Sequence, residues 1–435
     1  MSASGVSRIG FWTAVSLVMG NMIGSGIFLL PASLASYGGI GLLGWIVSAI
    51  GSILLALVFA RMSRLHPAAG GPYAFTRLAF GDLAGFLVAW GYWISVCCGN
   101  AAIALACVGY LEPFIPTLIR DPLTASAMAA AAVWLLTAVN VWGIREAGVV
   151  QLTTTILKIL PLLLIGAAAF VAFSPAPFAI EATGAREIGS QLSMAAAMTF
   201  WAFGGLESAT IPAGSVHDPQ RTIPRATMIG TSLTAVIYIV STVGVMSVMP
   251  IDTLTTSTAP FADAAGAFLG PWAATAVAAG AAIACFGALN GWILVAGQVP
   301  LAIAGDGLFP RTFGRVSPRG TPMSALIISS VLTSGLILLN ASRGLVELFT
   351  FIILLGTLNA LVPYVFCSLA GFLIDRSLWR RGRFGGPALV AAAAFGYSLW
   401  MIGGAGSEVV YWGFILMLAG LPVYVWVARH KSPAP

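Results

Sequence analysis

The residues with the greatest capacity for chemistry lie in MTFWAFGGLES, at residues 198–208, inside a long apolar run. Two adjacent glycines, Gly204 and Gly205, interrupt this run, and Glu207 adds a carboxylate to it. A carboxylate is costly in apolar surroundings, and glycine weakens a helix. The combination predicts a break in the helix, where backbone N–H and C=O groups lose their intrahelical partners and become free to bind a ligand.

A second glycine cluster occurs in GNMIGSGIFLLP, at residues 20–31. Amides at the start of a half-helix favour a carboxylate, and freed carbonyls favour an ammonium. Because an α-amino acid carries both groups on one carbon, two facing broken helices would suit it. Gly20 and Gly24, spaced by four, are equally compatible with close helix packing. Ser25–Gly26 and Gly204–Gly205 stand beside polar groups that packing does not need.

The composition is that of a membrane protein. Of 435 residues, 59% are hydrophobic and 8% are charged, and the mean hydropathy is +0.97. Soluble domains carry about 25% charged residues, so the lipid bilayer is the expected solvent, and the formal charge of +6 does not indicate nucleic acid. The five cysteines lie in apolar stretches without metal-type or disulfide spacing. We therefore expect packing cysteines, no metal and no cofactor.

Twelve apolar segments are long enough to span a bilayer, since a spanning helix needs about 20 apolar residues. The sequence predicts an all-α polytopic membrane protein with 12 transmembrane helices, forming a single domain over residues 1–435. The two breaks fall in the first and sixth segments. This spacing predicts a 5+5 inverted repeat with discontinuous helices 1 and 6, over about residues 8–175 and 188–374, followed by additional helices at 386–428. The expected segments are 10–34, 41–61, 84–111, 124–143, 151–174, 190–212, 227–249, 272–301, 323–341, 345–373, 387–404 and 408–428.

The basic residues predict the orientation. Of the 20 Lys and Arg residues, only Arg120, Arg186 and Arg343 fall in the connections of one side, Lys158 lies inside the fifth segment, and the rest lie on the other side. By the positive-inside rule both termini are expected in the cytoplasm, and the beginning of the chain reads as a mature cytoplasmic end rather than a signal peptide. The polar, glycine-rich stretch 66–81 is expected to be an interfacial or re-entrant piece on the cytoplasmic side.

Several motifs resemble one family of transporters. They lie in both predicted repeats and read NMIGSGIFLLPASLA (21–35), GGPYAF (70–75), FWAFGGLESA (200–209), DPQRTIPRA (218–226) and DGLFP (306–310). On these motifs the chain resembles the amino acid–polyamine–organocation superfamily, which shares its fold with the leucine transporter (LeuT). Within it, the chain is most similar to the bacterial basic amino acid/polyamine antiporters, which include arginine/agmatine exchangers.

The resemblance implies a substrate site at the two breaks. The substrate carboxylate would meet Ser25, Gly26 and the amide of Ile27, and the ammonium would meet the carbonyls of Ile23, Trp201 and Gly204. The resemblance also implies contacts with the side chain of the substrate: Trp292 would stack on a guanidinium or line the pocket, and Ile103 and Gly356 would face this side chain. Asn100 would hydrogen-bond along the transport path.

The resemblance also implies gates. Trp201 would cap the substrate from the outer side, Tyr92, Glu207 and Tyr364 would form the outermost gate, and Tyr73 would belong to the inner gate. Three roles remain open for Glu207: attraction of a cationic substrate, proton coupling, or acceptance of hydrogen bonds where the broken helix resumes.

Several pocket positions differ from the arginine/agmatine exchanger, among them Ser95–Val96, which stands in place of Ala–Cys. Gly356 replaces a serine, Gly204 replaces a larger aliphatic residue, and Ile103 replaces a methionine. The backbone half of the implied site is intact, so amino acid binding is expected, while the choice of side chain stays open.

Lys158 also differs from that exchanger. Proton-coupled and facilitative transporters of the superfamily resemble this chain in having a lysine there, near the place where sodium sits in sodium-coupled relatives. This implies sodium independence and a role in proton coupling. A lysine that snorkels to the membrane surface is the alternative.

These features together predict a secondary transporter of the bacterial cytoplasmic (inner) membrane, not an enzyme. The first expectation is exchange of arginine for agmatine or a related polyamine pair. The alternative is proton-coupled, sodium-independent uptake of neutral or broad-range amino acids. A channel or a transporter-like nutrient sensor is the alternative of a different class, for which a polar pore ring or a soluble output domain would be expected. Dimers occur in the relatives that the chain resembles, so a homodimer is also considered.

Overall fold

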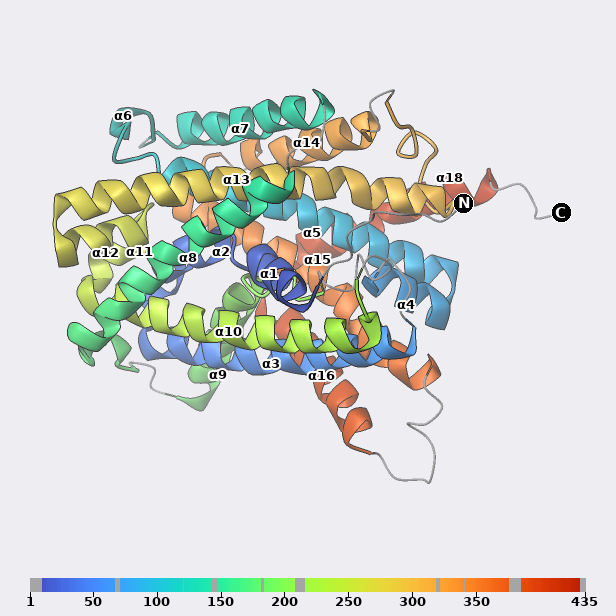
Figure 1. Ribbon diagram of the computed structural model, residues 1–435, viewed down its shortest axis with the longest axis horizontal. Coiled ribbons are helices and arrows are strands. Elements are labelled where there is room, and N and C mark those ends of the chain that lie inside the picture. The colour runs from blue at the N-terminus through green and yellow to red at the C-terminus, as the bar shows by residue number, and fades with distance from the viewer. Residues whose placement is uncertain are drawn as a thin grey trace.

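The computed structural model describes residues 10–430 except 67–70, 120, 143–146, 181–183, 208–215, 318–320, 340 and 375–384. The described chain folds into helices joined by short connections (Figure 1). In the first half they are α1 (Phe11–Met22), α2 (Ser25–Leu34), η1 (Ala35–Tyr37), α3 (Gly38–Leu65), α4 (Gly71–Phe80), α5 (Asp82–Gly109), α6 (Pro116–Ile119), α7 (Pro122–Trp142), α8 (Ala147–Val171) and η2 (Ala176–Phe178).

The second half continues the helical pattern. Its helices are α9 (Ala185–Trp201), α10 (Pro219–Val248), α11 (Ile251–Thr256), α12 (Pro260–Leu269), α13 (Pro271–Gly305), α14 (Met323–Leu338), α15 (Leu345–Ile374), α16 (Gly386–Gly404), α17 (Ser407–Leu418) and α18 (Gly420–Arg429).

The helices suit a bilayer by length and composition. Within the described residues, eight helices are long and apolar enough to cross a membrane, and the shorter apolar helices Lys158–Ala168 and Met323–Leu338 accompany them. Large apolar side chains on the outside of the bundle, such as Leu135, Leu163 and Phe414, are exposed. Lipid removes the cost of exposing them, because the hydrocarbon core of a bilayer is itself apolar.

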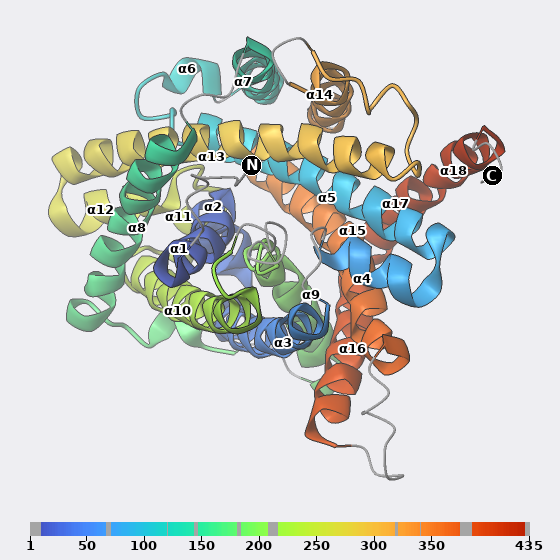
Figure 2. The same cartoon turned by 45° about the vertical axis from the view of Figure 1, so that its right-hand side comes forward.

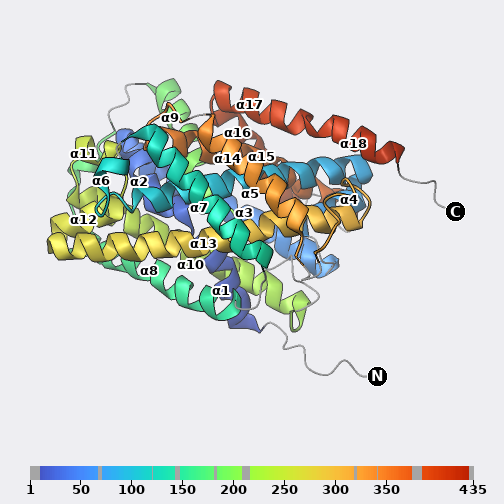
Figure 3. The ribbon, with the colours of Figure 1, turned by 90° about the horizontal axis from the view of Figure 1, so that it is seen from above.

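The core of the bundle is built around α5. This helix is almost entirely buried and packs against α15 and α13, which run beside it (Figure 2). A second layer, formed by α3 and α10, lies against α9 and α1. Seen from above, α4 and α18 lie toward one end of the molecule and α6, α11 and α12 toward the other (Figure 3). We call the first the α4 end and the second the α12 end.

The two expected breaks are present in the backbone. Between α1 and α2, Ile23 and Gly24 leave the helical conformation, and α2 restarts at Ser25. After Trp201, α9 gives way to a succession of turns, in which Gly205 has a φ of +100°. An L-residue with a side chain rarely adopts that backbone conformation, so glycine is required there.

Candidate functional site

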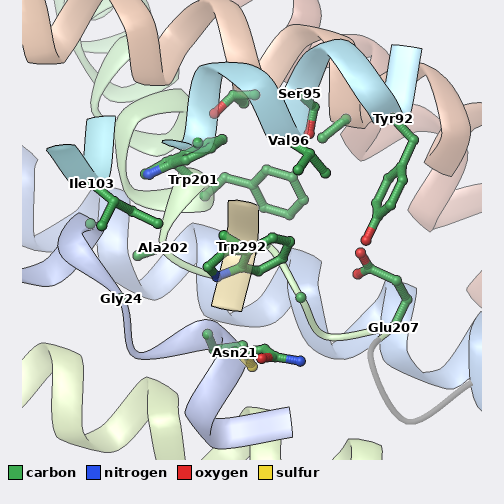
Figure 4. A pocket seen from close by; sticks show the side chains of 18 of the residues that line it. Asn21, Gly24, Tyr92, Ser95, Val96, Ile103, Trp201, Ala202, Glu207 and Trp292 are labelled. Atoms are coloured by element: carbon green, nitrogen blue, oxygen red, sulfur yellow. The ribbon is translucent and has the colours of Figure 1, made fainter. Parts of the chain in front are cut away.

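A central cavity lies where the two breaks meet (Figure 4). It encloses about 60 Å³, which is room for a few water molecules. Residues of both breaks line it together with side chains from α5, α13 and α15. Those used below are Gly24, Gly26, Tyr92, Gly99, Ile103, Trp201, Gly204, Glu207, Trp292 and Tyr364.

The indole of Trp201 lies in a cradle of three glycines. A Cβ built on Gly26 or Gly99 would lie 3.2 Å from the indole, at its Cδ1 and Cη2 atoms respectively. A Cβ on Gly356 would lie only 2.7 Å from Cζ3, closer than van der Waals contact permits. The cradle joins α2, α5 and α15 around one ring. Gly356 therefore serves the seating of Trp201 in this conformation.

Glu207 is bound by two tyrosines. Its carboxylate accepts a hydrogen bond of 2.8 Å from the hydroxyl of Tyr364, and the hydroxyl of Tyr92 points to the same group (Figure 4). The side chain of Glu207 is 1% exposed. It is the only charged side chain among the described residues that line the central cavity.

The three residues expected to form the outermost gate, Tyr92, Glu207 and Tyr364, lie together in the structure. Tyr92 lies in the first half of α5 and Tyr364 in the second half of α15, and both helices pack against α4. Glu207 follows Trp201 along a segment that comes from the opposite end. The three residues therefore lie between Trp201 and the α4 end.

Tyr238 of α10 joins the two breaks, a role that sequence reasoning missed. Its hydroxyl, which is fully buried, lies 2.6 Å from the carbonyl oxygen of Met22 and 3.1 Å from that of Ala202. A buried carbonyl that has lost its helical partner must find another donor. Tyr238 supplies one donor to both broken segments, and a single tyrosine in an apolar helix gave no signal for this in the sequence.

Comparison with known proteins now assigns the family. The family model described as amino acid permease matches residues 9–419. The chain belongs to this family. It is 37% identical over 374 residues to the cadaverine/lysine antiporter of Escherichia coli (strain K12), covering 83% of each chain. It is also 30% identical over 435 residues to the putrescine transporter PotE of the same strain, covering 98% of this chain and 97% of the relative.

The permease is thus a polytopic helical membrane transporter and not an enzyme. Its relatives place it among the antiporters of basic amino acids and polyamines. Expectations about the fold class and the transporter function are confirmed at this level. In the described part of the chain, no three His, Cys, Asp or Glu side chains lie together as a metal site would require.

The positions implied for backbone binding lie at the breaks of the permease. Gly26, Trp201 and Gly204 line the central cavity. The side chains of Ile23 and Ile27 are fully buried, so only their backbone groups remain for a ligand. The side chain of Ser25 lies outside the described part of the structure. The carbonyl of Trp201 already accepts a bond of 3.0 Å from the N–H of Gly204, which leaves one of its two lone pairs.

The positions implied for side-chain recognition divide into two groups. Ile103 and Trp292 line the central cavity. Asn100 lies behind it, where its Nδ2 donates to the carbonyl of Trp292 at 3.3 Å. Gly356 contacts Trp201, as described above, and does not itself line the cavity.

Tyr73 lies at the α4 end, in a polar network outside the central cavity. Its hydroxyl donates to Oδ2 of Asp306 at 2.9 Å, and Nη1 of Arg77 lies 3.5 Å from the same oxygen. Arg77 also pairs with Asp82 at 2.9 Å. Partial burial, together with the bond to Asp306, raises the pKa of Tyr73 well above its usual value. The network links α4 to the end of α13, and sequence reasoning found only Tyr73 of its members.

Lys158 is buried in α8 at 2% exposure. It does not reach the surface of the bundle, so the snorkelling alternative is wrong. Cys285 of α13 is an electrostatic neighbour of Lys158. Lys158 does not line the central cavity, and any influence on the substrate would therefore be indirect.

Proposed function

We propose that the permease exchanges a basic amino acid for its decarboxylated amine. The observation that carries the proposal is Glu207, a buried carboxylate at a cavity that is lined by two broken helices. A cationic substrate gains from this charge, because an ion pair in apolar surroundings is screened little. The two relatives, a cadaverine/lysine antiporter and a putrescine transporter, support the same substrate class.

The two breaks would bind the α-carboxylate and the α-ammonium, which all amino acids share. The amides at the start of α2, from Ser25, Gly26 and Ile27, would take the carboxylate. The carbonyls of Ile23, Trp201 and Gly204 would take the α-ammonium. An amine without a carboxylate would use only the second set, and Glu207 would offer a partner for a cation on either substrate.

The exchanged pair is proposed as either arginine with agmatine or lysine with cadaverine. A planar guanidinium has five donors and an ammonium has three. The cradle that holds Trp201 has a glycine at 356, where the arginine/agmatine exchanger has a hydroxyl. Because Gly356 lies behind Trp201 and does not line the cavity, it leaves both pairs open, and Trp292 is available to stack on a guanidinium.

The proposed mechanism depends on features of the fold that family membership alone does not establish. We propose 12 transmembrane helices with a 5+5 inverted repeat over about residues 8–175 and 188–374, helices 386–428 outside the repeat, and one domain over 1–435. The paired breaks in α1–α2 and after α9 support it. Transport would proceed by rocking the helices around the central cavity against the remaining scaffold, in the bacterial inner membrane, with both termini cytoplasmic and a homodimer as the assembly.

Counterflow in liposomes tests the function. Purified protein would be reconstituted into vesicles that contain no substrate, lysine with cadaverine, or arginine with agmatine. Uptake of labelled basic amino acid should saturate and should require an exchangeable substrate inside. Equal uptake into empty vesicles would contradict exchange, and uptake that never saturates would indicate a channel.

Proton-coupled, sodium-independent uptake is the second candidate, and Lys158 favours it. An ammonium at 2% exposure has a large cost if it stays charged without a partner, so a proton could leave it during transport. A pH gradient should then drive a neutral amino acid into empty vesicles with or without sodium. Lys158→Ala should abolish the pH dependence, and an unchanged profile in that variant would remove Lys158 from the coupling.

A further inference from the structure

A second cavity opens toward the α12 end of the molecule. It encloses about 750 Å³ between η1, α9, α11, α15 and α17. Met198 and Leu354 belong to its lining. They lie close in sequence to Trp201 and Gly356, which pack against each other beside the central cavity. The outer cavity therefore lies within about one helical turn of the residues beside the central cavity, although no described residue lines both cavities.

Arg343 lies in this outer cavity and makes three contacts there. Its Nη2 donates to Oε1 of Glu408 at 2.6 Å, and its Nη1 lies 3.4 Å from Oε1 of Glu347. The guanidinium carbon is 4.4 Å from the centre of the Phe351 ring. The side chain of Arg343 is 26% exposed, while those of Glu347 and Glu408 are 66% and 54% exposed. A cation is thus held on an aromatic face between two carboxylates that still reach the solvent.

We propose that Arg343 is a tethered cation that occupies a binding place for the substrate. The contacts that hold its guanidinium are those that the guanidinium or ammonium of a basic substrate would make: two carboxylates and an aromatic ring. An incoming substrate displaces Arg343, binds to Glu347, Glu408 and Phe351, and then passes to the central cavity. The inference rests on the proposed function, because it needs a cationic substrate.

The strength of the contacts is compatible with displacement. Ion pairs this exposed are worth little, because solvent and salt screen them. Two carboxylates and one guanidinium also leave a formal charge of −1 in the mouth of the cavity. The site therefore attracts a further cation and releases its own at small cost. A deeply buried pair would hold Arg343 permanently.

A purely structural role makes a different prediction. Glu347 lies in the first turn of α15 and Glu408 in the first turn of α17, so Arg343 also connects the beginnings of these two helices. If it were only a connector, removing its charge would loosen the protein and would affect both faces of the membrane alike. If it competes with the substrate, removing its charge should improve substrate binding on one face only.

The test compares Arg343→Gln with Glu408→Gln. Intact cells expose one face of the permease, and everted vesicles expose the other. With labelled lysine or arginine as the probe, Arg343→Gln should lower KM about 2- to 5-fold on one face, and Glu408→Gln should raise it by a similar factor there. KM on the other face should not change. Added salt should reduce both effects.

Arg221→Gln is the matched control. Arg221 also pairs with a neighbouring carboxylate, Asp218 at 3.8 Å, but lies at the beginning of α10, outside the outer cavity. The KM of Arg221→Gln should equal that of the wild type on the face where Arg343→Gln acts. An equal effect of Arg343→Gln on both faces, a raised KM, or a change in thermal stability alone would overturn the inference. Failure of the wild type to exchange either cation would instead overturn the proposed function itself, and the inference with it.

Discussion

The hydroxyl of Tyr238 lies 2.6 Å from the carbonyl oxygen of Met22, the last residue of α1. The same hydroxyl reaches the carbonyl of Ala202 in the other break at 3.1 Å. One side chain of α10 thus holds two backbone segments that must keep a defined separation if they are to bind the two ends of one small molecule.

Tyr238→Phe should weaken substrate binding. The ring would remain, but two buried carbonyls would lose their donor, at a cost of about 1 kcal/mol or about fivefold in affinity. Binding of labelled substrate and the thermal unfolding midpoint in detergent would measure the change. Tyr411→Phe, at an exposed position of α17, is the control and should behave as wild type. Unchanged affinity in Tyr238→Phe would show that the breaks keep their separation without this bond.

Gly356→Ser should displace Trp201. The new Cβ would meet the indole at 2.7 Å, and overpacking of this kind costs about 1–3 kcal/mol. We expect lower thermal stability and at least about fivefold slower exchange. Gly396→Ala is the control, because a Cβ there meets nothing within 4 Å. The double variant Gly356→Ser with Trp201→Leu should recover stability, and no recovery would place the clash elsewhere.

Glu207→Gln should reduce the affinity for cationic substrates. A hydrogen bond to a charged group is worth about 1.5–3 kcal/mol, which corresponds to about 10- to 100-fold. The amide keeps the size of the carboxylate and can still accept from Tyr364, so the fold should persist. Calorimetric titration with lysine, arginine and a neutral amino acid would compare the losses. A loss of the same size for the neutral ligand would indicate that Glu207 positions the backbone and does not attract the cation.

The sequence was sufficient for the features that a single segment determines. Gly24 and the pair Gly204–Gly205 could be recognised because glycines and polar groups are costly inside an apolar helix, and the structure confirms both breaks. The role of Gly356 could not be recognised, since it depends on an indole contributed by another helix. Asp306 was missed for the same reason, because its partner Tyr73 is distant in sequence.

The depth of the tyrosine–glutamate cluster in the bundle was also beyond the sequence. Tyr92, Glu207 and Tyr364 were correctly expected near one another, as the bond of 2.8 Å between Tyr364 and Glu207 confirms. Their depth depends on how far each helix extends before it reaches the cavity. Residue types alone carry no information about this depth.

Tyr73→Phe should make stability less sensitive to alkaline pH. Because the pKa of Tyr73 is raised in the folded protein above its ordinary value of 10.0, the folded state keeps a proton that the unfolded chain loses. Its contribution to stability is therefore present in full below about pH 10 and is lost as pH rises toward the folded pKa. Thermal midpoints in detergent at pH 8 and pH 10.5 would measure this. The thermal midpoint of the wild type should exceed that of Tyr73→Phe at pH 8, and the difference should shrink at the higher pH.

Asp306→Asn, which leaves an acceptor for the hydroxyl of Tyr73 but removes the charge, should retain part of the advantage at pH 8. A difference that grows with pH would contradict the network of Tyr73, Asp306 and Arg77.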